Sequence, residues 1–363
     1  MDDLTLRPYD GAAVVCFLTL PVLFYTGPAM LTEQSGQSAW IAVLSAHLLL
    51  LCVFLALTVL VRYTGGKDLI LAARSLAGRP IGILYGALLA AYFCFSTGLL
   101  VRECAEILKA YGLSLTPVYM VSGLLLGSAV AMNLFGGKAI VKSAGFFLLI
   151  VLLGLAVILM LGANRYRIDY LFPILGNGVD GLKSSTVSAA SMVEGVIILG
   201  LLTPAFKDTS KLRRSGIIAL GISCIFSVIF YLCLIMMFSA PLTGQMTSGF
   251  MEMGKSIYYN RFFYRFESGL LFFLIFASSL KASIGLYIAR KSAATAFGIN
   301  AAKALTLVCA ALVFGVAMLP TNLHDLTVRY LSLTRGYSAY FMAGAPLLLF
   351  LIAGFRRLIR HEK

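Results

Sequence analysis

The chain has 363 residues, of which 60% are hydrophobic and only 12% are charged. A soluble domain carries about 25% charged residues, so this composition excludes an ordinary water-soluble core. A membrane-spanning helix needs about 20 apolar residues, and ten such helices leave only short loops and no room for a separate catalytic domain. The net charge of +14 comes from basic residues spread between apolar runs, which is typical of membrane topology and argues against nucleic-acid binding.

Residue types that hold metals or cofactors are few and scattered. The seven cysteines lie nearly all within apolar runs and form no Cys-x-x-Cys motif, so we interpret them as small buried apolar residues. His47, His324 and His361 lie far apart in the sequence. We therefore expect no cofactor and no metal site, and an enzyme is the least favoured class because no nucleophile–base pair stands out.

Apolar runs bounded by charged residues, glycine and proline predict ten membrane-spanning helices. In chain order they cover about 12–35, 38–61, 80–108, 117–135, 143–162, 184–206, 216–239, 263–290, 302–319 and 337–355. The segment 65–77 combines basic side chains with an apolar face, which is typical of a short helix at the membrane surface. The long, semi-polar connection 240–262 is predicted to form a partly helical cap on the outer side.

The distribution of lysine and arginine predicts the orientation of these helices. With the N-terminus inside, eighteen basic residues fall on the cytoplasmic side and ten on the other side, while Lys281 lies within a span. Cytoplasmic loops of membrane proteins are enriched in Lys and Arg. Both termini are therefore predicted to be cytoplasmic.

Two of the ten spans carry features that interrupt a regular helix. The first contains Pro21 near its middle, and proline removes a backbone donor and clashes with the preceding turn. The sixth contains a cluster of Ser191, Glu194 and Gly195 about ten residues from its start, which places them near the bilayer centre. A simple kink remains an alternative for the first span, but the two irregular points share the same depth.

The two interrupted spans each open a group of five helices. Corresponding interruptions in the two halves of a transporter indicate a binding site near the middle of the membrane. Freed amide groups attract an anion and freed carbonyl groups a cation, so a zwitterionic amino acid suits both. The candidate ligand-binding residues are Thr19, Leu20 and Pro21 through their backbone, Ser191, Glu194 and Gly195 opposite them, and Ser96 as a side wall.

Several charged residues lie where lipid would penalise them. Glu194 is expected to face the interior of the bundle, either as a ligand-binding or cation-binding group or as a buried carboxyl that fixes packing. Lys281, preceded by Ser278 and Ser279, either extends to the inner headgroups or provides a fixed ammonium in place of a coupling ion. We treat these three residues as a candidate ion-surrogate site.

Two acid–base pairs are predicted at the outer membrane surface. Arg102 and Glu106 are four residues apart and share a helix face, whereas Glu103 points elsewhere. Arg265 and Glu267 open the eighth span at the same side. The pairs form either an external gate network or ordinary anchors at the interface.

Several motifs, in this order and at this spacing, resemble the B subunits, or permease subunits, of spore germinant receptors. This GerAB-type endospore germination permease family is a branch of the amino acid–polyamine–organocation superfamily. The matching segments run from one end of the chain to the other: Gly27-Pro28 followed by GQSAWIAVL at 36–44, GRPIGILYG at 78–86, LVRECAEIL at 100–108, YLFPILGNG at 170–178, Glu194-Gly195 with Pro204, and YRFESGLLFFLIF at 264–276.

The resemblance implies an all-α integral membrane protein with a LeuT-type fold, in which two inverted five-helix repeats have broken first and sixth helices. The repeats would cover about 12–162 and 184–355 of one transmembrane domain, 1–363. It also implies a subunit that senses a small germinant, often an amino acid. Such a subunit would assemble with A and C receptor subunits in the lipid bilayer of the spore inner membrane.

Three functions remain open on the sequence. The first is a ligand-sensing receptor subunit in which a nutrient binds between the first and sixth spans and changes the bundle angle. The second is a secondary transporter of an amino acid, operating by exchange or driven by protons through Glu194. The third is a structural membrane scaffold that binds nothing.

Overall fold

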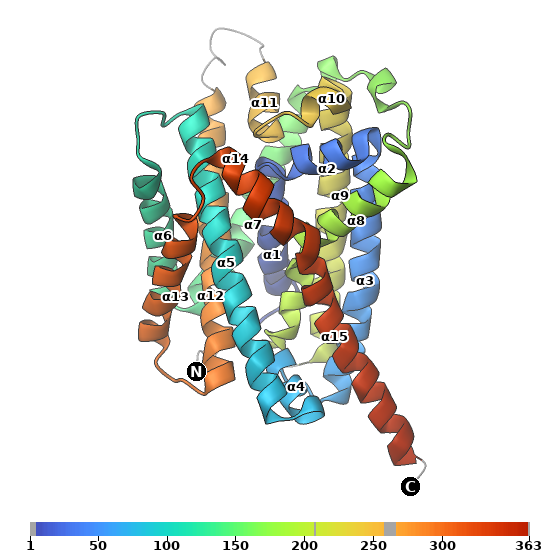
Figure 1. The fold of residues 1–363 in the computed structure, drawn as a ribbon, viewed down its shortest axis with the longest axis vertical. Helices are drawn as coiled ribbons and strands as arrows, with labels where there is room; N and C mark the ends of the chain where they lie inside the picture. Colours follow the sequence, from blue (N-terminus) through green and yellow to red (C-terminus); the bar gives the residue numbers. More distant parts are fainter. Residues whose placement is uncertain (1–4, 207, 258–265, 362–363) are drawn as a thin grey trace.

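The computed structural model describes residues 5–206, 208–257 and 266–361; the side chains of Glu194 and of residues 266–268 and 357–361 lie outside this description. Over these ranges the chain forms helices and their connections, with no strand. Figure 1 shows the long helices side by side along the long axis of the molecule, with α4 (Leu69–Ala77) at one end and α11 (Gly249–Ser256) at the other. We refer to these as the α4 end and the α11 end.

The apolar helices confirm the predicted spans. Seven stretches of the described chain are long and apolar enough to cross a membrane, and three shorter apolar helices accompany them, so each of the ten predicted spans contains such a helix. The helices that form the bundle are α1 (Pro8–Thr19), α3 (Ala39–Tyr63), α5 (Arg79–Tyr111), α6 (Val118–Leu134), α7 (Gly137–Leu161), α8 (Gly178–Val193), α9 (Thr209–Phe238), α12 (Phe266–Phe297), α13 (Ala302–Ala317) and α15 (Ser332–His361).

The first span is broken, as predicted. The α-helix ends at Thr19 and continues as a 3₁₀ helix, η1 (Leu20–Phe24), before α2 (Gly27–Ser35) begins. Pro21 removes a donor at the start of η1, which favours the change of winding. The fully extended residue is Tyr25, at φ −108° and ψ −155°, so the break itself falls a few residues after the predicted Thr19–Pro21 position.

The sixth span changes its winding in the same way. The α-helix α8 ends at Val193, and a 3₁₀ helix, η5 (Glu194–Gly200), follows it. Seven residues are long for a 3₁₀ helix, since runs above about four are uncommon. A Cβ atom on Gly195 would lie 2.9 Å from Cβ of Leu18, so η5 packs closely on the last turn of α1, where a larger residue would force the neighbouring atoms to shift.

The short helix α4 is attached to the end of α12 by hydrogen bonds. Its residues Leu69 and Ile70 are buried, and the guanidinium of Arg74 donates to the carbonyl oxygens of Thr295 (2.8 Å) and Ala296 (2.5 Å), near the end of α12. Arginine at a helix C-terminus satisfies carbonyl groups that lack an intrahelical partner. The amphipathic segment predicted at 65–77 is therefore a helix that clamps α12.

Asp68 caps α4, and its pKa permits a test. Its carboxylate accepts a hydrogen bond from the Leu71 amide at 2.8 Å, while burial raises the pKa of Asp68 above its ordinary value. A raised folded-state pKa contributes stability below the unfolded-state pKa and loses it as the pH rises through the folded-state value. We expect Asp68→Asn, which retains the cap without charge, to raise the melting temperature at pH 7, and this gain to vanish as the pH falls toward about 4.

The matched variant Asp68→Ala removes the cap and is expected to cost about 1 kcal/mol of unfolding free energy at pH 7. Thermal unfolding of the purified chain in detergent between acid and neutral pH measures both effects. A lower melting temperature for Asp68→Asn than for the wild type at pH 7 would contradict this account.

The connection at the α11 end is partly helical, as predicted. It contains α10 (Ala240–Thr243) and α11, within the part of 240–262 that is described. The hydroxyl of Ser248, which caps α11, donates to the Phe24 carbonyl at 2.7 Å, and the rings of Phe24 and Phe250 are 4.4 Å apart. The cap thus satisfies a backbone oxygen at the break of the first span.

The tenth span begins with a third irregular segment. The short helix α14 (Leu323–Asp325) leads into a π-helical segment, Leu326–Leu331, which continues as α15. Single π-helical turns are rare and are frequent at functional sites. Here the segment brings Leu331 and then Arg335 to the centre of the bundle, where both line the cavity described below.

Candidate functional site

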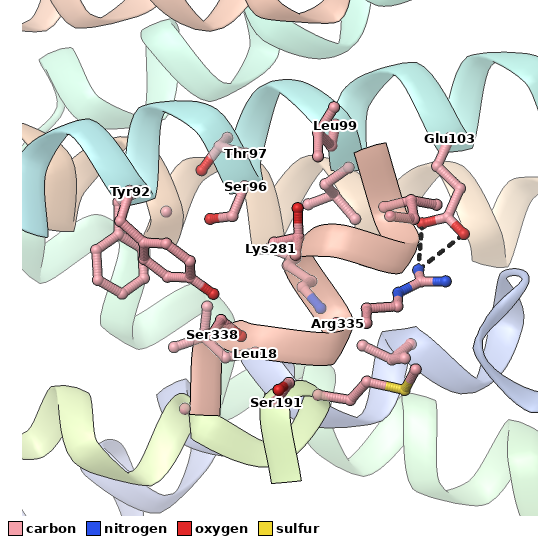
Figure 2. A pocket seen from close by; sticks show the side chains of 18 of the residues that line it. Leu18, Tyr92, Ser96, Thr97, Leu99, Glu103, Ser191, Lys281, Arg335 and Ser338 are labelled. Carbon is pink, nitrogen blue, oxygen red and sulfur yellow. Dashed lines mark hydrogen bonds and ion pairs between the residues drawn. The ribbon is translucent and has the colours of Figure 1, made fainter. Parts of the chain in front are cut away.

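A cavity of about 100 Å³ lies where the two broken spans meet α5, α12 and α15. Figure 2 shows its lining side chains converging from these elements. Its apolar and aromatic walls include Leu18, Val22, Tyr25, Tyr92, Phe93, Met192 and Ile198, and its polar groups include Ser96, Thr97, Glu103, Ser191, Lys281, Thr334, Arg335 and Ser338. A mainly apolar pocket with a few convergent polar groups is the usual form of a small-molecule site.

Four of the predicted site residues line this cavity. Ser96 comes from α5, Ser191 and Gly195 from the sixth span, and Lys281 from α12. Figure 2 shows the Lys281 side chain extending into the cavity. The hydroxyl of Ser191 accepts a hydrogen bond from the Ala339 amide at 3.0 Å, so it joins α8 to α15 at the cavity wall.

The predicted residues of the first span lie beside the cavity. Thr19, Leu20 and Pro21 are buried, while Leu18 and Val22 on either side of them line the space. Residues four apart on a helix share a face, so the residues between Leu18 and Val22 point into neighbouring packing. Thr19 is only 3% exposed, and yet its buried hydroxyl has no hydrogen-bond partner in the described part of the chain.

The remaining predicted residues support the cavity from outside or are not described. The Ser278 hydroxyl lies 2.5 Å from the Tyr25 hydroxyl and so connects α12 to the break of the first span. The backbone carbonyl of Ser279 accepts from Ser283 at 2.6 Å. Of the predicted ion-surrogate group, Lys281 alone lines the cavity. Glu194 is the first residue of η5, and its side chain lies outside the described residues.

A buried ion pair between Arg335 and Glu103 closes one end of the cavity, and sequence reasoning did not find it. The guanidinium and carboxylate are 2.7 Å apart, with the two side chains 9% and 2% exposed. Sequence spacing assigned Glu103 to a different face from Arg102 and Glu106, and that face is the cavity wall. A carboxylate in an apolar run with no partner on its own helix was the available signal for a distant cation.

Arg335 was not predicted as a site residue because it precedes the predicted tenth span. The apolar run that defined this span starts at residue 337, whereas α15 begins at Ser332. The guanidinium also donates to the Thr26 hydroxyl at 2.7 Å, so the pair joins α15, α5 and the start of α2. These three segments are far apart in the sequence, and only the fold brings them together.

The predicted pair of Arg102 and Glu106 is present, with 2.7 Å between the charged groups. Arg102 also donates to the carbonyl of Ala317, the last residue of α13, at 3.1 Å, and so connects α5 to α13. Both side chains are largely buried, which fits a packing role better than an exposed anchor. Arg265 lies outside the described residues, as does the side chain of Glu267.

The arrangement suits a small solute that carries charge. Of the described side chains in the lining, Lys281 and Arg335 are cationic and Glu103 is anionic. An apolar cavity of about 150 Å³ holds one benzene molecule, which has six non-hydrogen atoms, so by proportion the volume of about 100 Å³ here fits a solute of roughly four or five non-hydrogen atoms. Among the described residues no cluster of His, Cys, Asp and Glu could hold a metal ion.

The fold is that of a transporter class. The structure of Mhp1, a nucleobase-cation-symport-1 family transporter in a closed conformation with bromovinylhydantoin bound, matches 94% of this chain and 78% of its own chain. The TM-score is 0.68 at 13% sequence identity, so the likeness concerns the fold. Within the described ranges, ten apolar helices with broken first and sixth spans thus define a membrane protein of the LeuT-type transporter fold.

The family follows from the sequence comparison. The family model described as spore germination protein (Spore_permease) matches residues 6–326, and the chain belongs to this family. Among its relatives in Bacillus subtilis (strain 168), spore germination protein A2 is 21% identical over 98% of this chain and 97% of its own. Spore germination protein KB is 22% identical over 73% of both chains, and spore germination protein B2 is 23% identical over 57% of this chain and 55% of its own.

Proposed function

We propose that the chain is the nutrient-sensing membrane subunit of a spore germinant receptor, and that it binds a small zwitterionic nutrient, an amino acid, in the central cavity. The observation that carries this proposal is the position of the cavity at the contact between the two broken spans. Groups freed by such breaks recognise the charged ends of solutes. The proposed ligand contacts are Ser96, Ser191, Gly195 and Lys281, with Glu194 at the start of η5.

The setting of the subunit belongs to the same proposal. The α4 end, with its exposed Arg62, Lys67 and Arg79, would face the cytoplasm together with both termini, because cytoplasmic connections are enriched in basic residues. The subunit would lie in the spore inner membrane and assemble with A and C receptor subunits, as its resemblance to germinant receptor B subunits implies. The names of the Bacillus relatives support a role in spore germination.

Ligand binding would act by shifting the balance between two bundle arrangements. The cavity is enclosed by segments from both halves of the chain, so a solute that contacts η5, α5 and α15 together has different affinity for arrangements in which these segments approach or separate. That difference in affinity is the free energy available to signal occupancy to partner subunits. The proposed protein is a sensor and catalyses no reaction.

Spores that carry single substitutions in this chain provide the test. We expect Lys281→Gln to raise the nutrient concentration for half-maximal germination by at least about tenfold, since a charge-assisted hydrogen bond contributes about 1.5–3 kcal/mol. Lys303→Gln is the matched control, because Lys303 is exposed on α13. Equal responses of both variants and the wild type across a panel of amino acids would count against nutrient binding at this cavity.

The alternative is a secondary transporter of an amino acid, which the likeness to the fold of Mhp1 favours. In that case Glu194 would take up and release the coupling proton, or one solute would exchange for another. Proteoliposomes that contain only this chain distinguish the two functions. Accumulation of labelled amino acid without partner subunits supports a transporter, whereas binding without uptake supports a sensor.

A further inference from the structure

The Glu103 carboxylate is bound in the way that a ligand carboxylate would be. One oxygen accepts from the backbone amide of Thr26 at 3.1 Å, from the Thr26 hydroxyl at 2.5 Å and from Arg335 at 2.9 Å. The other accepts from Arg335 at 2.7 Å. The Thr26 hydroxyl in turn accepts from Arg335 at 2.7 Å, so donors of both Thr26 and Arg335 are directed to one carboxylate or to its immediate neighbour.

The position of this carboxylate is significant for the fold. Thr26 immediately precedes α2, the outer half of the broken first span. In transporters with broken helices, the N-termini of half-helices point at the anionic group of the substrate. In this chain a side chain from α5 occupies that position, and it is tethered to the protein.

The site remains within reach of a solute. Glu103 and Arg335 both line the central cavity together with Tyr25 and Lys281, and Figure 2 shows the ion pair beside the cavity. The space of about 100 Å³ adjoins the pair directly. A small solute in the cavity can therefore contact the guanidinium without passing through packed side chains.

We propose that Glu103 is a built-in occupant of a carboxylate site made by Thr26 and Arg335, and that a zwitterionic ligand inserts into the Arg335–Glu103 ion pair. The ligand carboxylate takes the hydrogen bonds of Arg335 and Thr26, and its ammonium group pairs with the displaced Glu103. This inference rests on the proposed function and names the groups that recognise the two ends of the nutrient.

Charge balance makes the insertion specific. A zwitterion leaves each buried ion with an opposite charge, whereas acetate alone would leave Glu103 unpaired and methylamine alone would leave Arg335 unpaired. An unpaired buried charge is strongly unfavourable. Insertion also breaks the hydrogen bonds and the ion pair that connect α5 to Thr26 and to α15. The ligand therefore has a direct effect on the packing of the broken first span.

Thermal unfolding of the full-length chain in lipid nanodiscs tests the exchange. The probes are glycine as the smallest zwitterion, and acetate and methylamine as its single-charge counterparts, all at equal concentration. For the wild type we expect a zwitterion to raise the melting temperature by about 2 °C or more, and acetate and methylamine to have no effect. For Glu103→Gln we expect acetate also to raise the melting temperature, because the Glu103 carboxylate no longer competes with acetate for Arg335.

Glu106→Gln is the matched control. Glu106 lies on the same helix as Glu103 and is paired with Arg102, but it does not belong to the described lining of the cavity. The variant is therefore expected to be less stable than the wild type and to show no response to acetate. If Glu103→Gln does not fold, Glu103→Asp shortens the tethered carboxylate by one methylene group and is expected to give a smaller acetate response.

Three results separate this inference from the proposed function. No acetate response in either Glu103 variant, or an equal response in the wild type, overturns the exchange while a zwitterion response of the wild type still supports nutrient binding. An acetate response in Glu103→Gln combined with no zwitterion response in the wild type upholds the carboxylate site and counts against nutrient binding. Both responses together uphold the exchange.

Discussion

Replacing Arg335 with leucine is expected to lower the free energy of unfolding by about 3–5 kcal/mol, because it leaves the Glu103 carboxylate buried without its cation. Glu103 is 2% exposed, so water does not compensate for the loss. The double variant Glu103→Leu/Arg335→Leu removes both charges and is expected to recover most of that free energy. Chemical denaturation of the four proteins in the double-mutant cycle, in detergent micelles, measures the coupling between the two residues.

An exposed ion pair in the same chain provides the control for this cycle. Lys183 and Asp180 are 3.3 Å apart with side chains 73% and 99% exposed, so Lys183→Leu is expected to change stability by less than about 1 kcal/mol. If the double variant is as unstable as Arg335→Leu alone, the lost stability comes from packing and the ion pair is not its source.

Filling the cavity is expected to abolish the nutrient response at ordinary concentrations with little change in stability. Ser96 lines the space on α5, and leucine at this position adds apolar volume to a cavity of only about 100 Å³. Overpacking a well-fitted space costs about 1–3 kcal/mol. In this variant the cost arises only when the ligand occupies the cavity beside the added leucine side chain. Ser96→Leu is therefore expected to weaken the response about 10- to 100-fold, measured as the nutrient concentration for half-maximal germination.

The same substitution away from the cavity is the control. Ser128 is exposed on α6, within a membrane-spanning segment, and Ser128→Leu is expected to respond as the wild type does. A wild-type response of Ser96→Leu, with both variants present at normal abundance, would place nutrient recognition outside this cavity.

Local sequence features were sufficient for the spans and for the two breaks. Pro21 removes a backbone donor wherever the chain places it, so the change from α to 3₁₀ winding at Leu20 follows from a local cause. The cluster of Ser191, Glu194 and Gly195 in the middle of the sixth span indicated an interrupted helix, and the α-helix α8 ends at Val193 within this cluster. The extended residue at Tyr25 was less predictable, because its conformation depends on Ser278 and on the cap at Ser248 as well.

Some residues of the candidate site were likewise predictable from local sequence features, and others were not. Ser96, Ser191 and Lys281 were identified because a polar residue deep in an apolar run is expensive and therefore faces the interior. The same reasoning could not tell which side of η1 faces the cavity, since that depends on how the first span is rotated against α8 and α5. Leu18 and Val22 occupy the wall expected for Thr19, Leu20 and Pro21 for this reason.

By itself, the amino-acid sequence determined that this protein lies in a membrane, where its helices run and where two of them are broken, because apolar length, proline and glycine act within a few residues of themselves. The tertiary structure alone decided that Glu103 meets Arg335, 232 residues further along the chain. No local pattern encodes such a pair, since its geometry arises only when α5, α15 and the break of the first span are packed around the same small cavity.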